Sequence, residues 1–199
     1  MSKRESWNKR YGATDLVWGA EPNRFVEEAL RDVEPRGRAL DVACGEGRNA
    51  IWLAERGWRT TAVDFSGVAI ERGRKLAARR GLEVEFIEAD LTSWVPEPGA
   101  YALALVLYLH IPPEERRQLW AHLAVGLAPG GEVFLAGHAL RNLSEGVGGP
   151  QDPSVLWESA EIRAELEAVG IHVLSAEPVR RSVEGSETDA LDLRISARR

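Results

Sequence analysis

From Arg38 onward, short runs of apolar residues alternate with segments whose apolar positions recur at helical spacing. The apolar runs predict five strands, at residues 38–43, 58–64, 82–90, 101–107 and 132–138. The segments between them predict helices at 49–57, 67–80 and 112–127. Strands that alternate with helices in this way are typical of a parallel α/β sheet with helices on its faces.

Beyond His138 the pattern changes. Residues 141–157 are rich in glycine and proline, which predicts a long loop, and long loops inside compact domains are often functional. A helix at 158–169 follows, and then two strands at 171–179 and 190–196 with turn residues between them. Because no helix separates these last strands, we expect them to pair antiparallel. The whole pattern predicts a doubly wound, seven-stranded, mostly parallel sheet that ends in an antiparallel edge hairpin.

The residues before the first strand form a separate piece. Residues 7–23 show no clear periodicity, whereas residues 24–33 predict a short amphipathic helix that Asn23 can cap. We therefore expect one domain, 1–199, in which residues 1–35 form an N-terminal lid and helix extension.

Length and charge narrow the function. The chain has 199 residues and a formal net charge of −6, which argues against a nucleic-acid partner and favours a small-molecule substrate. Its one cysteine, Cys44, excludes a disulfide-stapled scaffold. The longest apolar run, residues 100–109, is about half of the roughly 20 residues that a membrane helix needs. No signal peptide is visible, so we expect a cytoplasmic location without membrane association. Low lysine beside high arginine is associated with GC-rich bacterial genomes.

The segment LDVACGEGRNAIWLA (40–54) runs from a strand through a loop of small residues into a helix. Small residues let a ligand lie against the backbone, and the helix N-terminus offers free N–H groups to it. Two acids follow at strand ends. Asp64 ends the second strand, where a carboxylate can accept hydrogen bonds from ribose hydroxyls, and Asp90 ends the third. Three loops directed at one crevice predict a nucleoside-binding site.

The same loop permits a second interpretation. GEGRNA (45–50) fits the dinucleotide-binding pattern G-x-G-x-x-G/A, with Asp64 as its ribose acid. Asp41, inside the first strand, has no role in that pattern. The PGG turn at 129–131 and the terminal hairpin also belong to a different topology. An NAD(P)-dependent oxidoreductase therefore remains an alternative, as does a non-catalytic nucleoside-binding sensor.

The chain resembles the class I S-adenosylmethionine-dependent methyltransferases. Within them it is similar to the small-molecule branch that contains the tellurite-resistance and thiopurine methyltransferases. The resemblance lies in LDVACGEGRNAIWLA, AVDFS, EADLTSW, YLHIPPEERR and LAPGGEVFLAGH, with an opening of the type WNKRY…WGAEPN. It implies S-adenosylmethionine as cofactor and a small acceptor, with soft sulfur, selenium or tellurium nucleophiles among the candidates.

The resemblance also implies which residues hold the cofactor. Asp64 would bind the ribose, Phe65 would flank the adenine, and Asp90 with the Leu91 backbone would contact its amino edge. The remaining positions that it implies lie at the methionine and sulfonium end or beside these groups: Trp18, Asp41, Ala43, Cys44, Gly45, Gly47, Asn49, Ser66, Val106 and Leu107. Two positions depart from the family pattern. Ala43 stands where the first loop glycine is usual, and Ala102 where an acid is common.

Methyl transfer needs alignment, a dry site and, for a protonated nucleophile, a base. The candidate bases are His110 and His138, which follow the fourth and fifth strands, where ligands bind in such sheets. His122 and His172 lie in a helix and a strand pattern and are expected to pack or face solvent. The histidines and Cys44 show no metal-ligand spacing, so no metal is expected. A soft nucleophile needs no base.

The tryptophans divide into two sets. Trp52, Trp58 and Trp120 lie in helix or strand patterns and are expected in the core. Trp7 and Trp18 lie before the first strand, where no core is predicted. Two interpretations stay open for them: a lid in which Trp18 closes over the methionine end with Arg10 or Tyr11 nearby, or packing against the sheet edge.

Overall fold

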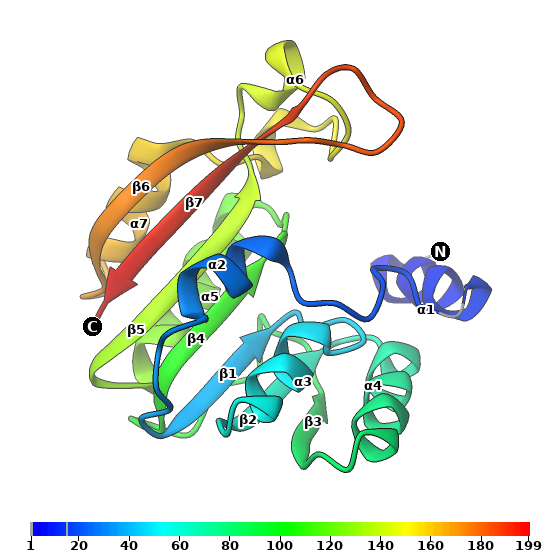
Figure 1. Cartoon of the computed structure of the whole chain (residues 1–199). Helices are drawn as coiled ribbons and strands as arrows, with labels where there is room; N and C mark the ends of the chain where they lie inside the picture. Colours follow the sequence, from blue (N-terminus) through cyan, green and yellow to red (C-terminus); the bar gives the residue numbers. More distant parts are fainter. Residues whose placement is uncertain (1, 15) are drawn as a thin grey trace.

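The sheet has seven strands in the order β3-β2-β1-β4-β5-β7-β6, and β7 alone runs opposite to the other six (Figure 1). The computed structural model describes residues 2–14 and 16–199. The strands are β1 Arg38–Val42, β2 Arg59–Asp64, β3 Val84–Glu88, β4 Tyr101–Leu107, β5 Leu127–His138, β6 His172–Arg181 and β7 Ala190–Arg198. The helices are α1 Lys3–Ala13, α2 Arg24–Leu30, α3 Arg48–Glu55, α4 Gly67–Arg79, α5 Pro113–Gly126, α6 Asn142–Glu145 and α7 Ser159–Glu167, with a 3₁₀ turn at Pro153–Val155. The predicted fold class is confirmed.

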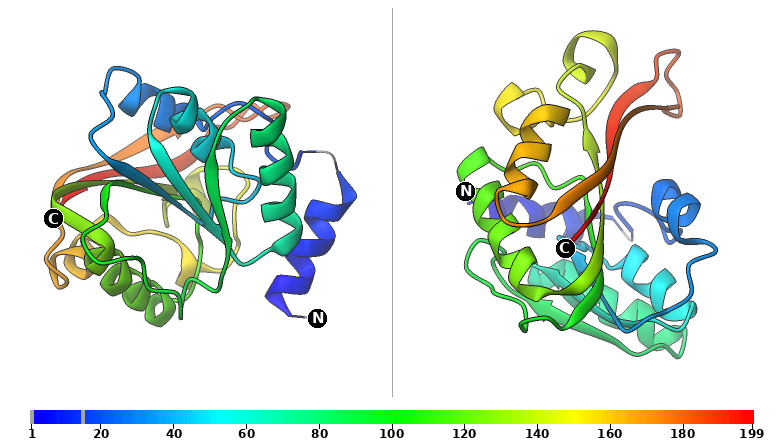
Figure 2. Two further views of the ribbon diagram at one scale, coloured as in Figure 1. Left: turned by 90° about the horizontal axis from the view of Figure 1, so that it is seen from below. Right: turned by 90° about the vertical axis from the view of Figure 1, so that its left-hand side faces the viewer.

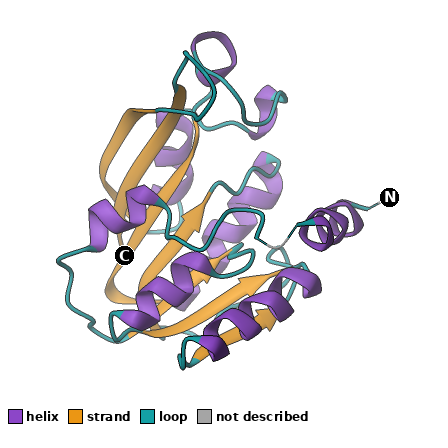
Figure 3. Cartoon of the chain, turned by 45° about the vertical axis from the view of Figure 1, so that its right-hand side comes forward, coloured by secondary structure: helices purple, strands orange, loops and turns teal. Residues whose placement is uncertain are grey.

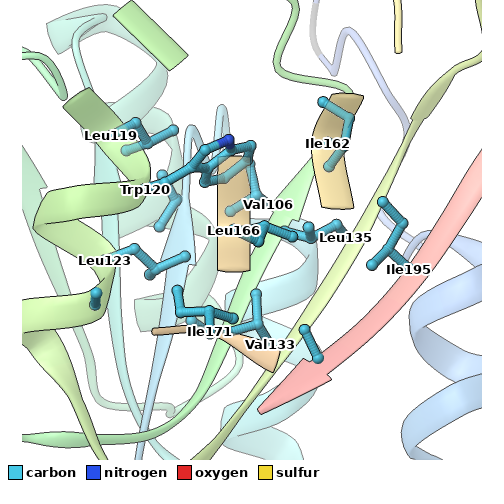
Figure 4. Packing of buried hydrophobic residues seen from close by; sticks show 14 of the residues in the cluster. Val106, Leu119, Trp120, Leu123, Val133, Leu135, Ile162, Leu166, Ile171 and Ile195 are labelled. Carbon is cyan, nitrogen blue, oxygen red and sulfur yellow. The ribbon is translucent and has the colours of Figure 1, made fainter. Parts of the chain in front are cut away.

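Side chains alternate between the two faces of the sheet, as the period of a strand requires. Leu40 and Val42 of β1 pack with α5 and α7 on one face, in a cluster that includes Trp120 and Leu166 (Figure 4). Ala39 packs on the other face, with α2 and α3. Figure 3 shows the helices lying on both sides of the strands. The predicted core tryptophans, Trp52, Trp58 and Trp120, are all buried.

The terminal hairpin is confirmed, and its position is informative. β7 lies between β5 and β6 and pairs antiparallel with both, so β6 is the edge strand. β5 is longer than predicted because residues 129–131 belong to it and not to a turn before it. The last residue explains this difference: Gly130 N–H donates to Arg199 O, and Arg199 N–H donates to Gly131 O.

The N-terminal residues contain a helix, α1, that the pattern did not predict. Its only buried side chain is Tyr11, so it has almost no apolar periodicity. A capping box starts it, in which Ser2 and Glu5 exchange side-chain and backbone hydrogen bonds. α1 lies beside α4, as the left view in Figure 2 shows. The second helix, α2, is shorter than predicted, and its cap at Asn23 is confirmed.

The expected long loop at 141–157 is ordered by hydrogen bonds and contains α6 and the 3₁₀ turn. Asn142 fastens it, because its side-chain oxygen accepts from Leu191 N–H while its amide donates to Gly148 O. Trp157 N–H donates to His138 O at the loop's end. Among residues 2–14 and 16–199, no helix has the length and apolar character needed to cross a membrane.

Candidate functional site

The loop after β1 takes a backbone conformation that favours glycine. Ala43, Gly45 and Gly47 have φ values of 55°, 56° and 77°, in the left-handed region. A Cβ on Gly47 would lie 2.5 Å from a ring carbon of the buried Phe86, so this position also needs glycine for space. Ala43 adopts the strained conformation without being glycine.

Asp64 joins this loop to the end of β2. One carboxylate oxygen accepts from Gly45 N–H at 2.9 Å and the other from Ser66 N–H at 2.8 Å. Burial raises the pKa of Asp64, against the opposing effect of these backbone hydrogen bonds. Phe65 N–H is a third backbone donor to this carboxylate. Because a carboxylate has about four acceptor positions, it retains one for a ligand hydroxyl. The geometry therefore fits the predicted ribose contact.

Asp41 lies under the same loop. Its side chain is buried and accepts from Ala50 N–H at 3.1 Å, at the start of α3. Burial raises the pKa of Asp41 to about 7, and the nearby Arg48 opposes that rise. A carboxyl group with this pKa can lose its proton when a cation binds nearby.

The N-terminal segment, residues 2–14 and 16–23, lies on the glycine loop. The hydroxyl of the buried Tyr11 is 2.7 Å from where a Cβ of Gly45 would stand. Trp18 donates its indole N–H to that hydroxyl at 3.4 Å, and Val17 N–H donates to Glu46 at 2.8 Å. Arg48 donates to Trp18 O at 2.8 Å. Trp18 keeps 44% of its surface exposed.

The aromatic residues of this segment form one group. Trp7 stacks on Tyr11 with ring centroids 5.6 Å apart and lies 6.3 Å from Trp18. The Arg10 guanidinium lies over the Trp7 and Trp18 rings. These residues cover the loop where the methionine end was predicted.

The predicted adenine contacts follow β2 and β3. Phe65 is partly exposed, and Asp90 is exposed and accepts from Thr92 N–H and its hydroxyl, at 3.0 and 2.8 Å. The hydroxyl and then the amide of Thr92 lower the pKa of Asp90 and keep it ionised. Leu91 is buried in the core, so its side chain is unavailable to a ligand.

Several predicted side chains have their polar atoms or surfaces engaged elsewhere. Asn49 accepts from Asn23 N–H at 2.8 Å, and Ser66 caps α4 and donates to Asn8.

Cys44 and Val106 are buried in the core, whereas Leu107 is half-buried. Burial raises the pKa of the Cys44 thiol well above its usual value. Contacts of these residues to a cofactor stay predictions, and for Cys44 and Val106 they would be made by the backbone.

The two candidate bases lie together, with ring centroids 5.3 Å apart. His110 Nδ1 lies 3.2 Å from Val155 O, and its Nε2 accepts from His138 N–H at 3.3 Å. Burial lowers the pKa of His110 to about 4, so it is neutral at pH 7. Both of its nitrogens are thus engaged in fastening the 141–157 loop to β5. His138 instead places Nδ1 3.0 Å from Asp192 Oδ1.

The other histidines are placed as expected: His122 is half-buried in α5 and His172 is exposed on β6.

Three side chains that lie around His138 were not predicted from the sequence as site residues. Tyr108 donates to Asp192 at 2.7 Å, and Arg181 donates to both of them. Asp192 stands within the apolar strand ALDLRIS, and an acid at such a position was the available signal. The role of Asp192 depends on which strand lies beside it, because that strand determines which side chain faces the carboxylate.

Two further observations concern the described part of the chain. No group of three or more histidine, cysteine, aspartate or glutamate side chains there is arranged to hold a metal ion. A cavity of about 700 Å³, lined by Trp58, Arg59 and Glu85 among others, opens at the opposite edge of the sheet. It is separate from the site described above.

Residues 39–131 match the family described as a methyltransferase domain. A 2-heptyl-1-hydroxyquinolin-4(1H)-one methyltransferase of Mycobacteroides abscessus is 28% identical over 118 residues, 58% of this chain and 52% of that protein. A ribosomal RNA small subunit methyltransferase C of Alcanivorax borkumensis is 32% identical over 107 residues, 50% of this chain and 31% of that protein. The chain thus spans about half of the first relative and about a third of the second.

Solved structures share the whole fold. A structure from work on the conversion of a disulfide bond into a thioacetal group during echinomycin biosynthesis superposes with a TM-score of 0.76 at 22% identity. The match covers 100% of this chain and 92% of that one. TehB from Haemophilus influenzae superposes with a TM-score of 0.72 at 15% identity, covering 100% of this chain and 67% of that one.

Proposed function

The chain has the domain of a class I S-adenosylmethionine-dependent methyltransferase, and from that premise we propose that it transfers a methyl group to a small-molecule acceptor. The observation that carries the proposal is the position of Asp64. This buried carboxylate ties Gly45 of the glycine loop to the end of β2 and keeps an acceptor position for a ribose hydroxyl.

We assign the cofactor contacts by their place in the fold. Asp64 would hold the ribose, and Gly45 and Gly47 would let the methionine part lie close to the backbone. Phe65 and Asp90 would contact the adenine. Bound S-adenosylmethionine would supply an electrophilic methyl carbon on a positively charged sulfur. Asp41, ionised when that charge is near, would favour the cation over its neutral product.

Charge supports a small acceptor. A net charge of −6 disfavours a polyanionic substrate, and the quinolone methyltransferase among the relatives has a small acceptor by its name. The ribosomal RNA relative keeps nucleic acid among the alternatives to be tested. The cytoplasmic location stays a prediction from the sequence.

The sheet order argues against the oxidoreductase alternative. The dinucleotide-binding fold has the order 3-2-1-4-5-6 with parallel strands. Here an antiparallel β7 is inserted between β5 and β6. The antiparallel strand also places Asp192 Oδ1 3.0 Å from His138 Nδ1.

Turnover of methyl-labelled S-adenosylmethionine tests the proposal. The acceptors should include phenols, ring N–H heterocycles, thiols, selenite, tellurite and ribosomal RNA. Labelled product from a small acceptor, and none from RNA, is the expected result. Label found only in RNA, or cofactor binding with no turnover of any acceptor, would contradict it.

A further inference from the structure

A buried cluster of polar side chains lies where β4, β5 and β7 meet. Asp192 is completely buried, and its Oδ2 accepts from Tyr108 and from Arg181 Nε, each at 2.7 Å. Its Oδ1 lies 3.0 Å from His138 Nδ1. Neither of these last two atoms has another hydrogen-bond partner among the described residues. His138 is therefore the only partner of Asp192 Oδ1 among the described residues.

The fold holds this pair in place. His138 and Asp192 stand directly opposite each other in the antiparallel β5–β7 ladder, so their side chains share one face. Tyr108, immediately after β4, has a φ of 54°, which is rare for a bulky residue and is often kept at functional sites. Its ring lies edge-on to the His138 ring at 5.2 Å.

The charges around Asp192 determine which nitrogen of His138 carries the proton. Burial alone would raise the pKa of Asp192, but hydrogen bonds from His138, Arg181 and Tyr108 outweigh it and lower the pKa. A carboxylate at Nδ1 favours the tautomer with the proton on Nδ1. The lone pair is then on Nε2, where the ring can accept a proton.

The two nitrogens of the ring differ in their surroundings. Nδ1 is completely buried, whereas the side chain as a whole keeps 11% of its surface exposed, so the exposed surface belongs to other atoms of the side chain. Nε2 forms no hydrogen bond to a described residue. Gly149 of the long loop lies against the ring on this side, since a Cβ there would be 2.7 Å from Cδ2 and 2.9 Å from Nε2, so the loop leaves room beside Nε2 only because residue 149 is glycine. His110 cannot replace His138, because both of its nitrogens are engaged.

We propose that Asp192, supported by Tyr108 and Arg181, positions His138 as the base for an acceptor that carries an exchangeable proton, a hydroxyl or a ring N–H. The inference rests on the proposed methyltransferase function and deepens it. As the acceptor oxygen or nitrogen bonds to the methyl carbon, the carbon–sulfur bond breaks and its electron pair stays on sulfur. The acceptor's proton moves to Nε2 of His138 and later to water.

This assignment selects against soft acceptors. Thiolates and tellurium or selenium anions are already nucleophilic at neutral pH and gain little from a base. A hydroxyl or ring N–H acceptor gains about 10²–10⁴-fold from a positioned base. A buried carboxylate that holds one nitrogen of an imidazole suits the second class.

Nitrogen NMR of the imidazole tests the positioning without any acceptor. In the wild-type protein with S-adenosylhomocysteine bound, neutral His138 should carry its proton on Nδ1. Asp192→Asn should move the population toward the Nε2–H tautomer, and His172→Gln, at an exposed site on β6, should leave the signals unchanged. A wild-type His138 protonated on Nε2, or one whose tautomer is unaffected by Asp192→Asn, would overturn the proposal.

Kinetics with phenol and ring N–H acceptors against thiol, selenite and tellurite acceptors test the chemistry. His138→Gln should lower kcat/KM for the first class by 100-fold or more, chiefly through kcat. Asp192 on β7, Tyr108 and His110 after β4, and Arg181 on β6 are the titratable groups that face His138. Asp192→Asn should reduce kcat about tenfold with a smaller effect on KM. Equal activity of His138→Gln and wild type on a phenol or ring N–H acceptor would overturn the proposal.

Binding of S-adenosylhomocysteine separates a failure of the proposed function from a failure of the His138 assignment. If S-adenosylhomocysteine does not bind, the proposed function is wrong. If it binds equally to wild type and His138→Gln while the expected tautomer is absent, only the assignment of His138 is wrong. The NMR result decides the assignment where no acceptor in the panel turns over.

Discussion

Ala43 shows how one residue can carry strain at a ligand loop. Its φ of 55° costs an L residue about 1–2 kcal/mol that glycine avoids. Related methyltransferases are expected to have glycine there, and the conformation explains why. The departure seen in the sequence is therefore a local cost that the loop tolerates.

Replacing this alanine tests the strain directly. Ala43→Gly should leave the free energy of unfolding unchanged or raise it by up to about 1 kcal/mol, because relief of strain offsets the entropy of glycine. The matched control is Ala78→Gly, at an exposed position within α4, which should lose about 1 kcal/mol. Denaturant unfolding measures both. An equal loss in the two variants would contradict the account.

Asp41 links stability to pH. Its pKa is about 7 in the folded protein and about 4 in the unfolded chain, so the folded state binds more protons between these values. The contribution of Asp41 to the free energy of unfolding is therefore largest below pH 4, and it falls as the pH rises toward 7. Between pH 5 and pH 8 the loss is about 2–3 kcal/mol.

Asp41→Asn should remove that contribution, since an amide can accept from Ala50 N–H and does not titrate. The free energy of unfolding of the variant should therefore exceed that of wild type more at pH 8 than at pH 5, by about 2–3 kcal/mol. Asp32→Asn, at an exposed position, should change nothing with pH. Parallel pH dependence of wild type and Asp41→Asn would show that Asp41 does not titrate in this range.

At the scale of elements, the N-terminal segment is the least predictable part and the one that covers the glycine loop. α1 escaped prediction because it is polar on nearly all sides and depends on its cap and on α4. The two interpretations of the N-terminal segment, a lid over the cofactor or packing against the sheet edge, differ in one respect. Only a lid would couple the segment to cofactor affinity.

Glu46 offers a way to separate them. Its buried side chain accepts from Val17 N–H and pairs with Arg72, so Glu46→Ala should loosen the segment. Hydrogen exchange of residues 3–13 should become faster, and the Kd for S-adenosylhomocysteine should rise about tenfold if the segment is a lid. Glu55→Ala, which breaks an ion pair with Arg80 at the other end of α3, is the control. Faster exchange with an unchanged Kd would support packing alone.

At the scale of the whole molecule, what could be predicted follows from periodicity. The strands, the helices between them and the antiparallel hairpin were visible because buried strands and amphipathic helices leave regular patterns. The glycine loop and Asp64 were visible because they are contiguous with strand ends.

The rest depended on contacts between distant segments. Asp192 faces His138 only because β7 is inserted beside β5 in one register, which the hairpin's sequence does not specify. The hydrogen bonds between Arg199 and residues 130–131, which extend β5, likewise join segments that are far apart in the sequence. Asn49 and Ser66 were predicted as cofactor contacts, but their side chains also hold the N-terminal segment, which had no predicted structure.

Calorimetry with S-adenosylhomocysteine and with NAD tests whether Asp64 and the glycine loop form the cofactor site of a methyltransferase. We expect 1:1 binding of S-adenosylhomocysteine to the wild-type protein, at least a tenfold weaker Kd for Asp64→Asn, and no heat with NAD. Binding of NAD in the absence of S-adenosylhomocysteine binding would contradict it.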